Sequence, residues 1–429
     1  MLKTMALFLV FLPAAFAQND APDLLHDIQA RPAMRIEQFE QIASTANPTL
    51  QQATALVNQA AGQAKQAGLY PNPTVGYQGE QIRGGSFGGG EQGAFVQQTF
   101  VLGGKLGLRR NAFEQQRRSA EIGMLEQKYR VLSDVDQSFY SALAAQELVN
   151  ARKRLLVLTR DALATARQLG NVGQADAPDV LQAEVESERA ALDYVSAQRF
   201  YLGAFHTLAA TVGKPDLPVS TLAGNLEVLP ALEETQLIGR ILRDSPSVKR
   251  AEQDVARAEA ELKSAKRESI PDLEVRGGIE QNFEHLSETS NRPVGAQGFA
   301  SAGINLPIFN RNQGNVAATE AALTRARAEV SRVRLALRQS TEPLLEDYLS
   351  ARFQAARYKS EVLPRAAHAY QLYLDKYRQM AAAYPQVLVS QRTLFDLQVE
   401  YIGVLEKLWN DAAILQNYGL SAGLAAPLP

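Results

Sequence analysis

The 429-residue sequence contains no cysteine, and several other features that carry chemistry are scarce or absent. Without cysteine the chain cannot form disulfides, thiolate metal sites or a cysteine nucleophile. Its four histidines, His26, His206, His285 and His368, lie too far apart in the sequence to share metal-ligand spacing. After the N-terminus no stretch reaches the roughly 18 apolar residues that a membrane-spanning helix needs. These absences argue against a metal centre, cysteine chemistry and a transmembrane helix.

The sequence also lacks a recognisable catalytic or phosphate-binding motif. His285, with Glu284 and Glu288, comes nearest to a metal site, but a solvated loop is the better interpretation. The glycine-rich segment 84–90 follows a strand pattern without opening a helix, so the dinucleotide fingerprint fails. Lysine and arginine number 44 against 46 acidic residues, which gives no sign of nucleic-acid binding. We therefore predict a protein that is not an enzyme, uses no cofactor and binds no nucleic acid.

The N-terminus has the order of a secretory signal peptide. Lys3 supplies a positive charge, residues 5–12 are apolar, and residues 15–17 form an A-x-A cleavage site. A buried apolar N-terminal helix is the alternative. We expect cleavage after Ala17, export of the mature chain, and no N-terminal lipid, because no cysteine follows the site.

A β-hairpin is predicted between two long helical segments. Val275 and its apolar neighbours alternate with Glu274 and other polar residues, which is typical of a strand with two unlike faces. Two strands are expected at about 272–283 and 297–306, joined by a loose polar segment around 291–295. A long hairpin between long helices is unusual, and the chain contains it twice.

The same order of elements occurs in both halves of the chain, about 200 residues apart. Each half has a helix, a proline break, a strand, a loop, a strand and a long helix, which indicates duplication of one structural unit. The first pair of strands is expected at about 72–83 and 92–101. The expected divisions are the signal peptide (1–17), an N-terminal segment (18–46), repeat one (47–212), a linker with a short helix (213–244), repeat two (245–418) and a tail (419–429).

The long helices carry apolar residues at seven-residue spacing, which predicts a narrow seam along a coiled coil or bundle. A helix of roughly 60 residues would be on the order of 90 Å long, more than a compact domain allows. Pro343 and Pro364 are expected to kink or break the second long helix. The residues of the seams are Leu125, Leu132 and Phe139 in repeat one and Val316, Leu323, Val330, Leu337, Leu344, Ala351 and Tyr358 in repeat two.

Strands of about ten residues suffice to cross a bilayer at a tilt, but four strands with open edges cannot lie alone in lipid. Three copies would give twelve strands in a closed C₃ arrangement, continued by an α-helical barrel. The expected fold is thus mainly α with a membrane β-barrel, built by a homotrimer in contact with outer-membrane lipid. Aromatic residues near the strand ends would form interfacial girdles: Tyr70, Tyr77, Phe95, Phe100, Phe283, Phe299 and Phe309.

Short motifs in this plan resemble the TolC-type outer-membrane efflux proteins over nearly the whole mature chain. The motifs are Tyr-Pro-Asn-Pro at 70–73, Leu-Pro-Ile-Phe at 306–309, and Gly-Asn-Val-Gly at 170–173 followed by Asp-Val-Leu-Gln-Ala at 179–183. Leu-Gly-Gly-Lys at 102–105 resembles the heavy-metal branch. The resemblance implies a passive trimeric exit duct that docks on a periplasmic adaptor and an RND-type inner-membrane pump of a Gram-negative bacterium.

The resemblance also implies roles for the two helical turns. Asp179 matches a position facing the periplasmic aperture, where three copies would form an acidic ring that favours cations. Asp176 would reinforce this ring, and Gln386 stands where an acidic residue can occur in the family. The residues expected to meet the adaptor are Gly170, Asn171, Val172, Gly173, Leu181, Tyr384, Val387 and Leu388.

Other functions remain open from the sequence. The same duct could export drugs or solvents, or a polypeptide by type I secretion. A periplasmic coiled-coil adaptor is a further alternative, although an adaptor would have one helical hairpin flanked by β-rich domains.

Overall fold

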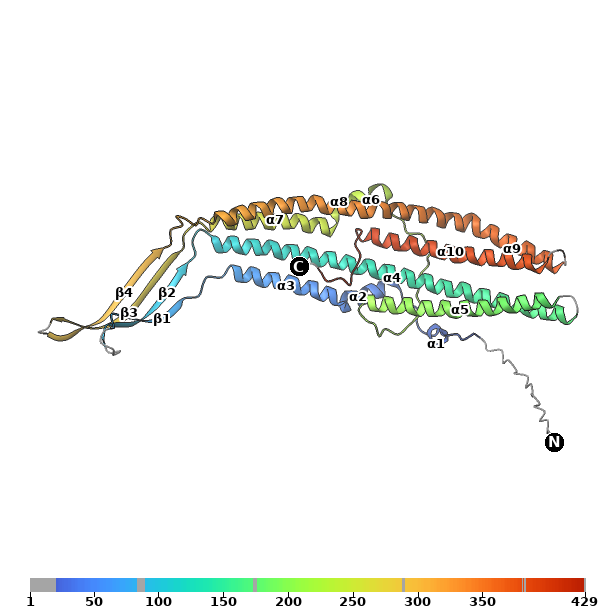
Figure 1. Cartoon of the computed structure of the whole chain (residues 1–429), viewed down its shortest axis with the longest axis horizontal. Coiled ribbons are helices and arrows are strands. Elements are labelled where there is room, and N and C mark those ends of the chain that lie inside the picture. The colour runs from blue at the N-terminus through green and yellow to red at the C-terminus, as the bar shows by residue number, and fades with distance from the viewer. Residues whose placement is uncertain are drawn as a thin grey trace, which may run out of the picture.

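The computed structural model is elongated, with a sheet at one end and long helices running to the other (Figure 1). It describes residues 21–82, 89–172, 176–287, 290–379, 381 and 383–427. The expected signal peptide and its cleavage site, the glycine-rich loop, Gly173 and Glu288 lie outside these residues. The tips of two helical hairpins lie side by side at the end opposite the sheet (Figure 1).

The elements follow the predicted order. They are α1 (His26–Gln29), α2 (Ile36–Ala46), α3 (Pro48–Ala67), β1 (Thr74–Glu80), β2 (Glu91–Phe100), α4 (Lys105–Asn171), α5 (Ala177–Thr211), α6 (Glu234–Asp244), α7 (Pro246–Arg267), β3 (Leu273–Ser287), β4 (Ser290–Ile304), α8 (Gln313–Arg357), the π-helix η1 (Tyr358–Val362), α9 (Leu363–Arg378) and α10 (Tyr384–Gln416).

Local sequence explains where the helices begin. The Asn47 side chain caps α3 by accepting a hydrogen bond from the Thr49 backbone N–H, and Pro48 occupies the first turn, where no donor is needed. Helices α5, α7, α9 and α10 also have proline in their first turn. The 67 residues of α4 make it about 100 Å long at 1.5 Å per residue.

The four strands form one antiparallel sheet in the order β1–β2–β3–β4. Strands β3 and β4 extend further than expected, because the segment 291–295 belongs to β4 and not to a loose loop. Backbone pairing does not depend on side-chain polarity, and two register shifts after Asn282 place Pro293 opposite His285. The polar composition of this segment led to the wrong prediction.

The two prolines in the second long helix behave differently. Helix α8 continues through Pro343, so the predicted alternative of a break there is wrong, and the predicted kink stays a prediction. Neighbouring helices support α8 and offset the single hydrogen bond that proline removes. The helix does change near Pro364, where η1 precedes α9 and Pro364 lies in the first turn of α9. The expected segmentation is confirmed at this second site.

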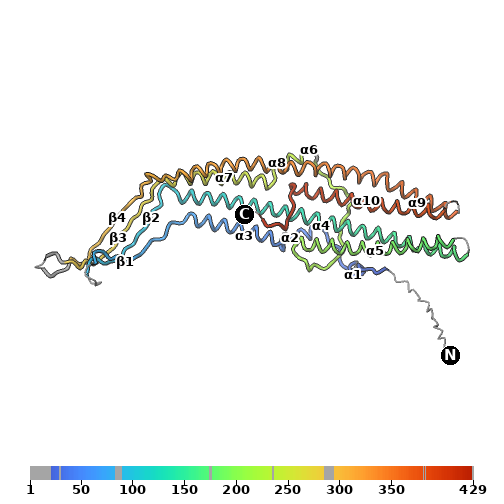
Figure 2. Tube along the Cα trace, viewed as in Figure 1, coloured from blue at the N-terminus to red at the C-terminus, as the bar shows by residue number. Residues whose placement is uncertain are grey.

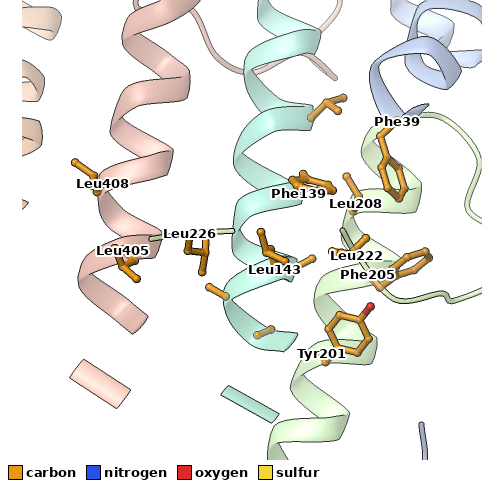
Figure 3. Packing of buried hydrophobic residues seen from close by; sticks show 14 of the residues in the cluster. Phe39, Phe139, Leu143, Tyr201, Phe205, Leu208, Leu222, Leu226, Leu405 and Leu408 are labelled. Atoms are coloured by element: carbon orange, nitrogen blue, oxygen red, sulfur yellow. The ribbon is translucent and has the colours of Figure 1, made fainter. Parts of the chain in front are cut away.

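The largest core lies midway along the helices, where α2, α4, α5 and α10 meet. Phe39, Phe139 and Phe205 pack with tilted or edge-on rings, and Leu405 and Leu408 of α10 belong to the same cluster (Figure 3). The C-terminal tail returns to this region, as the trace in Figure 2 shows. Asp134 accepts backbone hydrogen bonds from Ala422 and Gly423 of the tail.

The seven-residue seam is confirmed in α8 and only partly in α4. In α8 every residue of the seam, from Val316 to Ala351 at seven-residue spacing, is buried or half-buried. Tyr358 in η1 is half-buried as well. In α4 Phe139 is buried, but Leu125 is exposed and the polar neighbours Glu126 and Gln127 are buried in its place. Glu126 forms an ion pair with Arg130 and Gln127 donates to the Gly423 carbonyl, so polar contacts displace the apolar seam there.

Ion pairs of Lys105 and Arg109 connect the start of α4 to the segment that leads into the sheet. Lys105, at the start of α4, is 3% exposed, and its Nζ lies 2.6 Å from a carboxylate oxygen of Asp272. It also donates to the Ile270 carbonyl at 2.9 Å. One turn along α4, Arg109 forms a two-point ion pair with Glu268. These contacts join α4 to the residues immediately before β3.

Candidate functional site

The register gives the sheet two chemically unlike faces. Partners across the strands share a face, so Gln97 lies beside Arg276, and Val96 lies beside Gly277 on the other side. The polar face carries Gln78, Glu80, Glu91, Gln97, Glu274, Arg276, Glu280 and Gln297, and the apolar face carries Val75, Tyr77, Ala94, Val96, Phe100, Val275, Ile279, Ala300, Ala302 and Ile304.

Exposure on these faces is the reverse of that in a water-soluble sheet. On the apolar face Val75 and Ile279 are each 73% exposed, whereas Arg276 and Glu280 on the polar face are half-buried. A continuous exposed apolar face of this kind marks contact with another apolar medium. The two faces of the sheet therefore suit two different surroundings, one apolar and one polar.

The edges of the sheet are open within the described chain. Strand β1 pairs only with β2, and β4 only with β3, so each has one side without strand partners. Open edges cannot be left in an apolar medium, because unpaired backbone groups there cost several kcal/mol each. In such a medium the sheet would need further strands beside β1 and β4.

The strand-end aromatics divide between the two faces. Tyr70, Tyr77 and Phe100 are exposed, in keeping with the predicted girdles. Phe95 and Phe299 instead lie on the polar face, where both rings contact the Arg276 guanidinium. The girdle prediction is wrong for these two residues because it took no account of register.

The first helical tip places most of its predicted residues at the surface. Gly170 and Asn171 end α4, and Val172 follows them with 67% of its surface exposed. A side-chain carbon at Gly170 would lie 3.2 Å from Val180, so glycine permits close approach of α4 and α5. Leu181 is 61% exposed in the second turn of α5.

The acidic residues of this tip stand at the beginning of α5. Asp176 is the N-cap residue and is exposed, and its carbonyl accepts from the backbone N–H of Asp179 at 3.0 Å. Asp179 lies in the first turn, where the helix dipole favours negative charge. Both carboxylates therefore lie at the N-terminal end of α5.

The second helical tip is more deeply packed than expected. Tyr384, Val387 and Leu388 are buried, contrary to the expectation that they lie on a partner-facing surface, whereas Gln386 is exposed. Tyr384 and Leu388 pack with Leu163, Ala166 and Ala183 of the first hairpin. The first turns of α10 are apolar, and their side chains cover apolar side chains of α4 and α5.

Packing brings Asp179 of the first tip into the electrostatic environment of the second. The rings of Tyr377 and Tyr384 lie 5.6 Å apart. Burial, followed by nearby charges that include Asp179, raises the pKa of Tyr384 to about 12, and burial and Asp179 raise the pKa of Tyr377. Two of the candidate residues, far apart in sequence, thus form one local cluster.

An ion pair that the sequence did not reveal joins the two return helices. Arg392 of α10 binds Glu186 of α5 through two nitrogens, and this hydrogen bonding raises the pKa of the guanidinium. The pair lines a cavity of about 100 Å³ with Arg152 and Asp193, whose charged atoms lie 3.2 Å apart. No sequence signal links Glu186 to Arg392, because each lies within an ordinary amphipathic helix.

A second unforeseen feature is a pair of acids between α2 and α4. Burial, together with the charge of Glu40, raises the pKa of Asp136 to about 7. Asn417, the C-cap residue of α10, donates to Asp136 at 3.2 Å.

Two further features are absent from the described residues. None of their helices combines the length and apolarity that a membrane span requires. No group of three or more acidic or histidine side chains within them is arranged to hold a metal ion.

Comparison with known proteins gives a family and several relatives. The family model described as outer membrane efflux protein matches residues 41–214 and 237–418. The cobalt-zinc-cadmium resistance protein CzcC of Cupriavidus metallidurans is 28% identical over 407 residues, which cover 94% of each chain. The toluene efflux pump outer membrane protein TtgC of Pseudomonas putida is 26% identical over 313 residues, covering 68% of this chain and 59% of that protein.

The fold has close counterparts among solved structures. A crystal structure of CusC, reported with its transmembrane channel formation, superposes with a TM-score of 0.72 at 20% identity. The match covers 90% of this chain and 92% of that one.

Proposed function

The chain belongs to the outer membrane efflux protein family and is an outer-membrane channel subunit for efflux, and we propose that three copies form a passive duct for heavy-metal cations. The observation that carries this proposal is the sheet with its exposed apolar face and half-buried polar face. In a closed barrel the first would meet lipid and the second would line the lumen.

Assembly of three copies is supported by the open sheet edges and by the helices. Four strands per chain give twelve in a trimer, an even number within the range of such barrels. Leu181, Val185 and Leu192 form an exposed apolar stripe along one face of α5. A neighbouring copy would cover this stripe and continue the helices as an α-barrel.

The two halves of the chain are the repeats of a duplicated unit in this proposal. Repeat one, 47–212, contains α3, β1, β2, α4 and α5, and repeat two, 245–418, contains α7, β3, β4, α8 to α10. Residues 213–244 link them and include α6. The first seventeen residues are a signal peptide that directs export and is removed after Ala17.

Heavy-metal cations are the proposed cargo for two reasons. CzcC, a cobalt-zinc-cadmium resistance protein, aligns with 94% of this chain. Asp176 and Asp179 would form an acidic ring at the periplasmic aperture of the trimer, with Gln386 as its uncharged counterpart in repeat two. The duct itself supplies no energy, and an inner-membrane pump of the RND type would drive transport.

A periplasmic adaptor would dock at the helical tips. Gly170, Asn171, Val172 and Leu181 offer the exposed surface, and Gly173 lies between them in sequence. The buried Tyr384, Val387 and Leu388 would act from within, by holding the second hairpin against the first.

Export of solvents or drugs is the second candidate, favoured by the similarity to a toluene efflux protein. An exposed hollow of about 460 Å³ between α9 and α10 also has an apolar lining that includes Ala366, Tyr373 and Val389. Polypeptide secretion has no comparable structural support in the described residues.

Metal and drug tolerance of a strain lacking this protein separates the two cargoes. We expect sensitivity confined to cobalt, zinc, cadmium, nickel or copper salts, restored by the wild-type chain. Sensitivity to dyes, detergents and antibiotics alone would retain the duct and contradict the cargo.

A further inference from the structure

An arginine stacked on aromatic rings lies on the polar face of the sheet. The Arg276 guanidinium carbon is 4.0 Å from the centre of the Phe95 ring and 5.8 Å from that of Phe299. Its Nη2 also donates to the Gln78 side chain. All four strands of the sheet therefore contribute to the position of this one charge.

Glycines make room for the rings beside the strands. A side-chain carbon at Gly76 would lie 2.6 Å from the Phe95 ring, and one at Gly278 would lie 2.8 Å from the Phe299 ring. Only glycine at these positions lets both rings lie against the sheet as a support for Arg276. Glycine at these two positions thus lets the rings hold the Arg276 guanidinium against the polar face of the sheet.

The charge of Arg276 is opposite to that of its surroundings. Among the paired residues of the polar face, Glu80, Glu91, Glu274 and Glu280 are acidic and Arg276 is the one cation. Arg276 forms no ion pair with any described carboxylate, although several share its face. An arginine stacked on aromatic rings, and not neutralised by a partner, keeps its full effect on passing ions.

We propose that Arg276, held on Phe95 and Phe299, is a selectivity residue of the barrel lumen. Three copies would form a ring of positive charge in an otherwise acidic wall, which lowers the preference of the barrel for cations. This inference rests on the proposed trimeric duct. It assigns charge selectivity to the membrane end of the molecule, separate from the acidic aperture at the helical tips.

Reversal potentials of single trimers in planar bilayers under a potassium chloride gradient test this role. We expect Arg276→Gln to shift the reversal potential toward the potassium equilibrium potential, whereas Arg276→Lys retains the wild-type value. Arg243→Gln, on α6 and 74% exposed, is the matched control and should produce no shift. A wild-type reversal potential for Arg276→Gln would overturn the inference.

The cysteine-free chain permits a rescue experiment at the same position. In Arg276→Cys the introduced thiolate attacks the sulfur of an aminoethyl methanethiosulfonate, a sulfinate leaves, and the new disulfide restores a positive charge. The reversal potential should then return toward wild type, and a sulfonatoethyl reagent should move it the other way. Val275→Cys, on the apolar face, is the control and should respond to neither reagent.

Two outcomes refute different parts of the account. If the wild-type chain forms neither trimers nor channels, the proposed duct is wrong. If it forms channels and the two reagents have the same effect at Arg276→Cys, Arg276 does not face the ion path and only this inference fails.

Discussion

The two long helical hairpins follow the same course through the molecule but are held to different extents. Helix α4 has buried side chains from Lys105 to Ala166. Helix α8 has its first buried residue at Leu337, and no residue of α9 is buried within the described chain. Within the described chain the first hairpin is therefore the more deeply buried scaffold, and the second is the more exposed one.

The tips of the hairpins differ in chemistry as well. Helix α5 begins with the exposed Asp176 and the half-buried Asp179, whereas α10 begins with the buried Tyr384 and the neutral Gln386. The tips of the two halves thus differ. The tip of repeat one carries acidic residues, and the tip of repeat two supplies apolar packing. The following predictions test this division, from the largest expected effect to the smallest.

The largest effect is expected from shortening a core aromatic in α4. Phe139→Ala should destabilise the fold by about 3–5 kcal/mol, because Phe139 is buried between Phe39 and Tyr140. Phe353→Ala removes the same side chain from an exposed site on α8 and should change stability by less than about 0.5 kcal/mol. Thermal unfolding followed by circular dichroism measures both. Equal losses would show that the hairpins do not differ as scaffolds.

Neutralising the acid of the first tip should alter ion block without altering assembly. Asp179→Asn removes three charges from the proposed aperture of the trimer, so block by divalent or trivalent cations in planar bilayers should weaken about tenfold or more. Gln386→Ala, at the neutral tip of repeat two, is the matched control and should leave block unchanged. Unchanged block in Asp179→Asn trimers would remove this residue from the aperture.

A pH effect is expected at Asp136 in the first hairpin. The pKa of Asp136 is raised from 3.8 to about 7 in the folded chain, so folding favours its protonated form. Stability from this group is complete below pH 4 and is lost as the pH rises through 7. Asp136→Asn should therefore raise stability at pH 8 by on the order of 2 kcal/mol and have little effect at pH 4. A gain that is the same at both pH values would assign the effect to packing.

The smallest effect concerns the π-helix of the second hairpin. The Tyr358 hydroxyl donates to Glu400 at 2.8 Å, and its ring stacks on Tyr401. Tyr358→Phe should cost roughly 0.5–1 kcal/mol, the value of one partly exposed hydrogen bond. A double-mutant cycle with Glu400→Gln isolates that contact, and a coupling energy of zero would show that the hydrogen bond does not secure η1.

Periodicity and turn residues predicted most of the fold. The alternation around Val275 identified the strands, and Pro48, Pro178 and Pro385 marked the helix starts. Pro343 misled the prediction because a helix supported along its length tolerates one lost hydrogen bond. Local sequence signals predict local structure well. They give little information about the tertiary contacts that stabilise that structure.

The candidate site was less predictable because it depends on long-range contacts. The face on which Phe95 lies follows from strand register, and the burial of Tyr384 follows from packing between the hairpins. The ion pair of Glu186 with Arg392 joins residues 206 positions apart. Each of these facts depends on which distant segments pack together. The type of a residue and its immediate neighbours in sequence do not reveal that packing.

The orientation of the sheet is the central claim, and adjacent positions in β3 test it directly. Ile279 lies on the apolar face and Glu280 on the polar face. Because the chain has no cysteine, Ile279→Cys and Glu280→Cys each provide a single thiol for a membrane-impermeant, hydrophilic maleimide applied to intact cells. We predict labelling of Glu280→Cys trimers and protection of Ile279→Cys trimers by lipid. Labelling of Ile279→Cys with protection of Glu280→Cys, or equal labelling of both, would contradict a lipid-embedded barrel with a polar lumen.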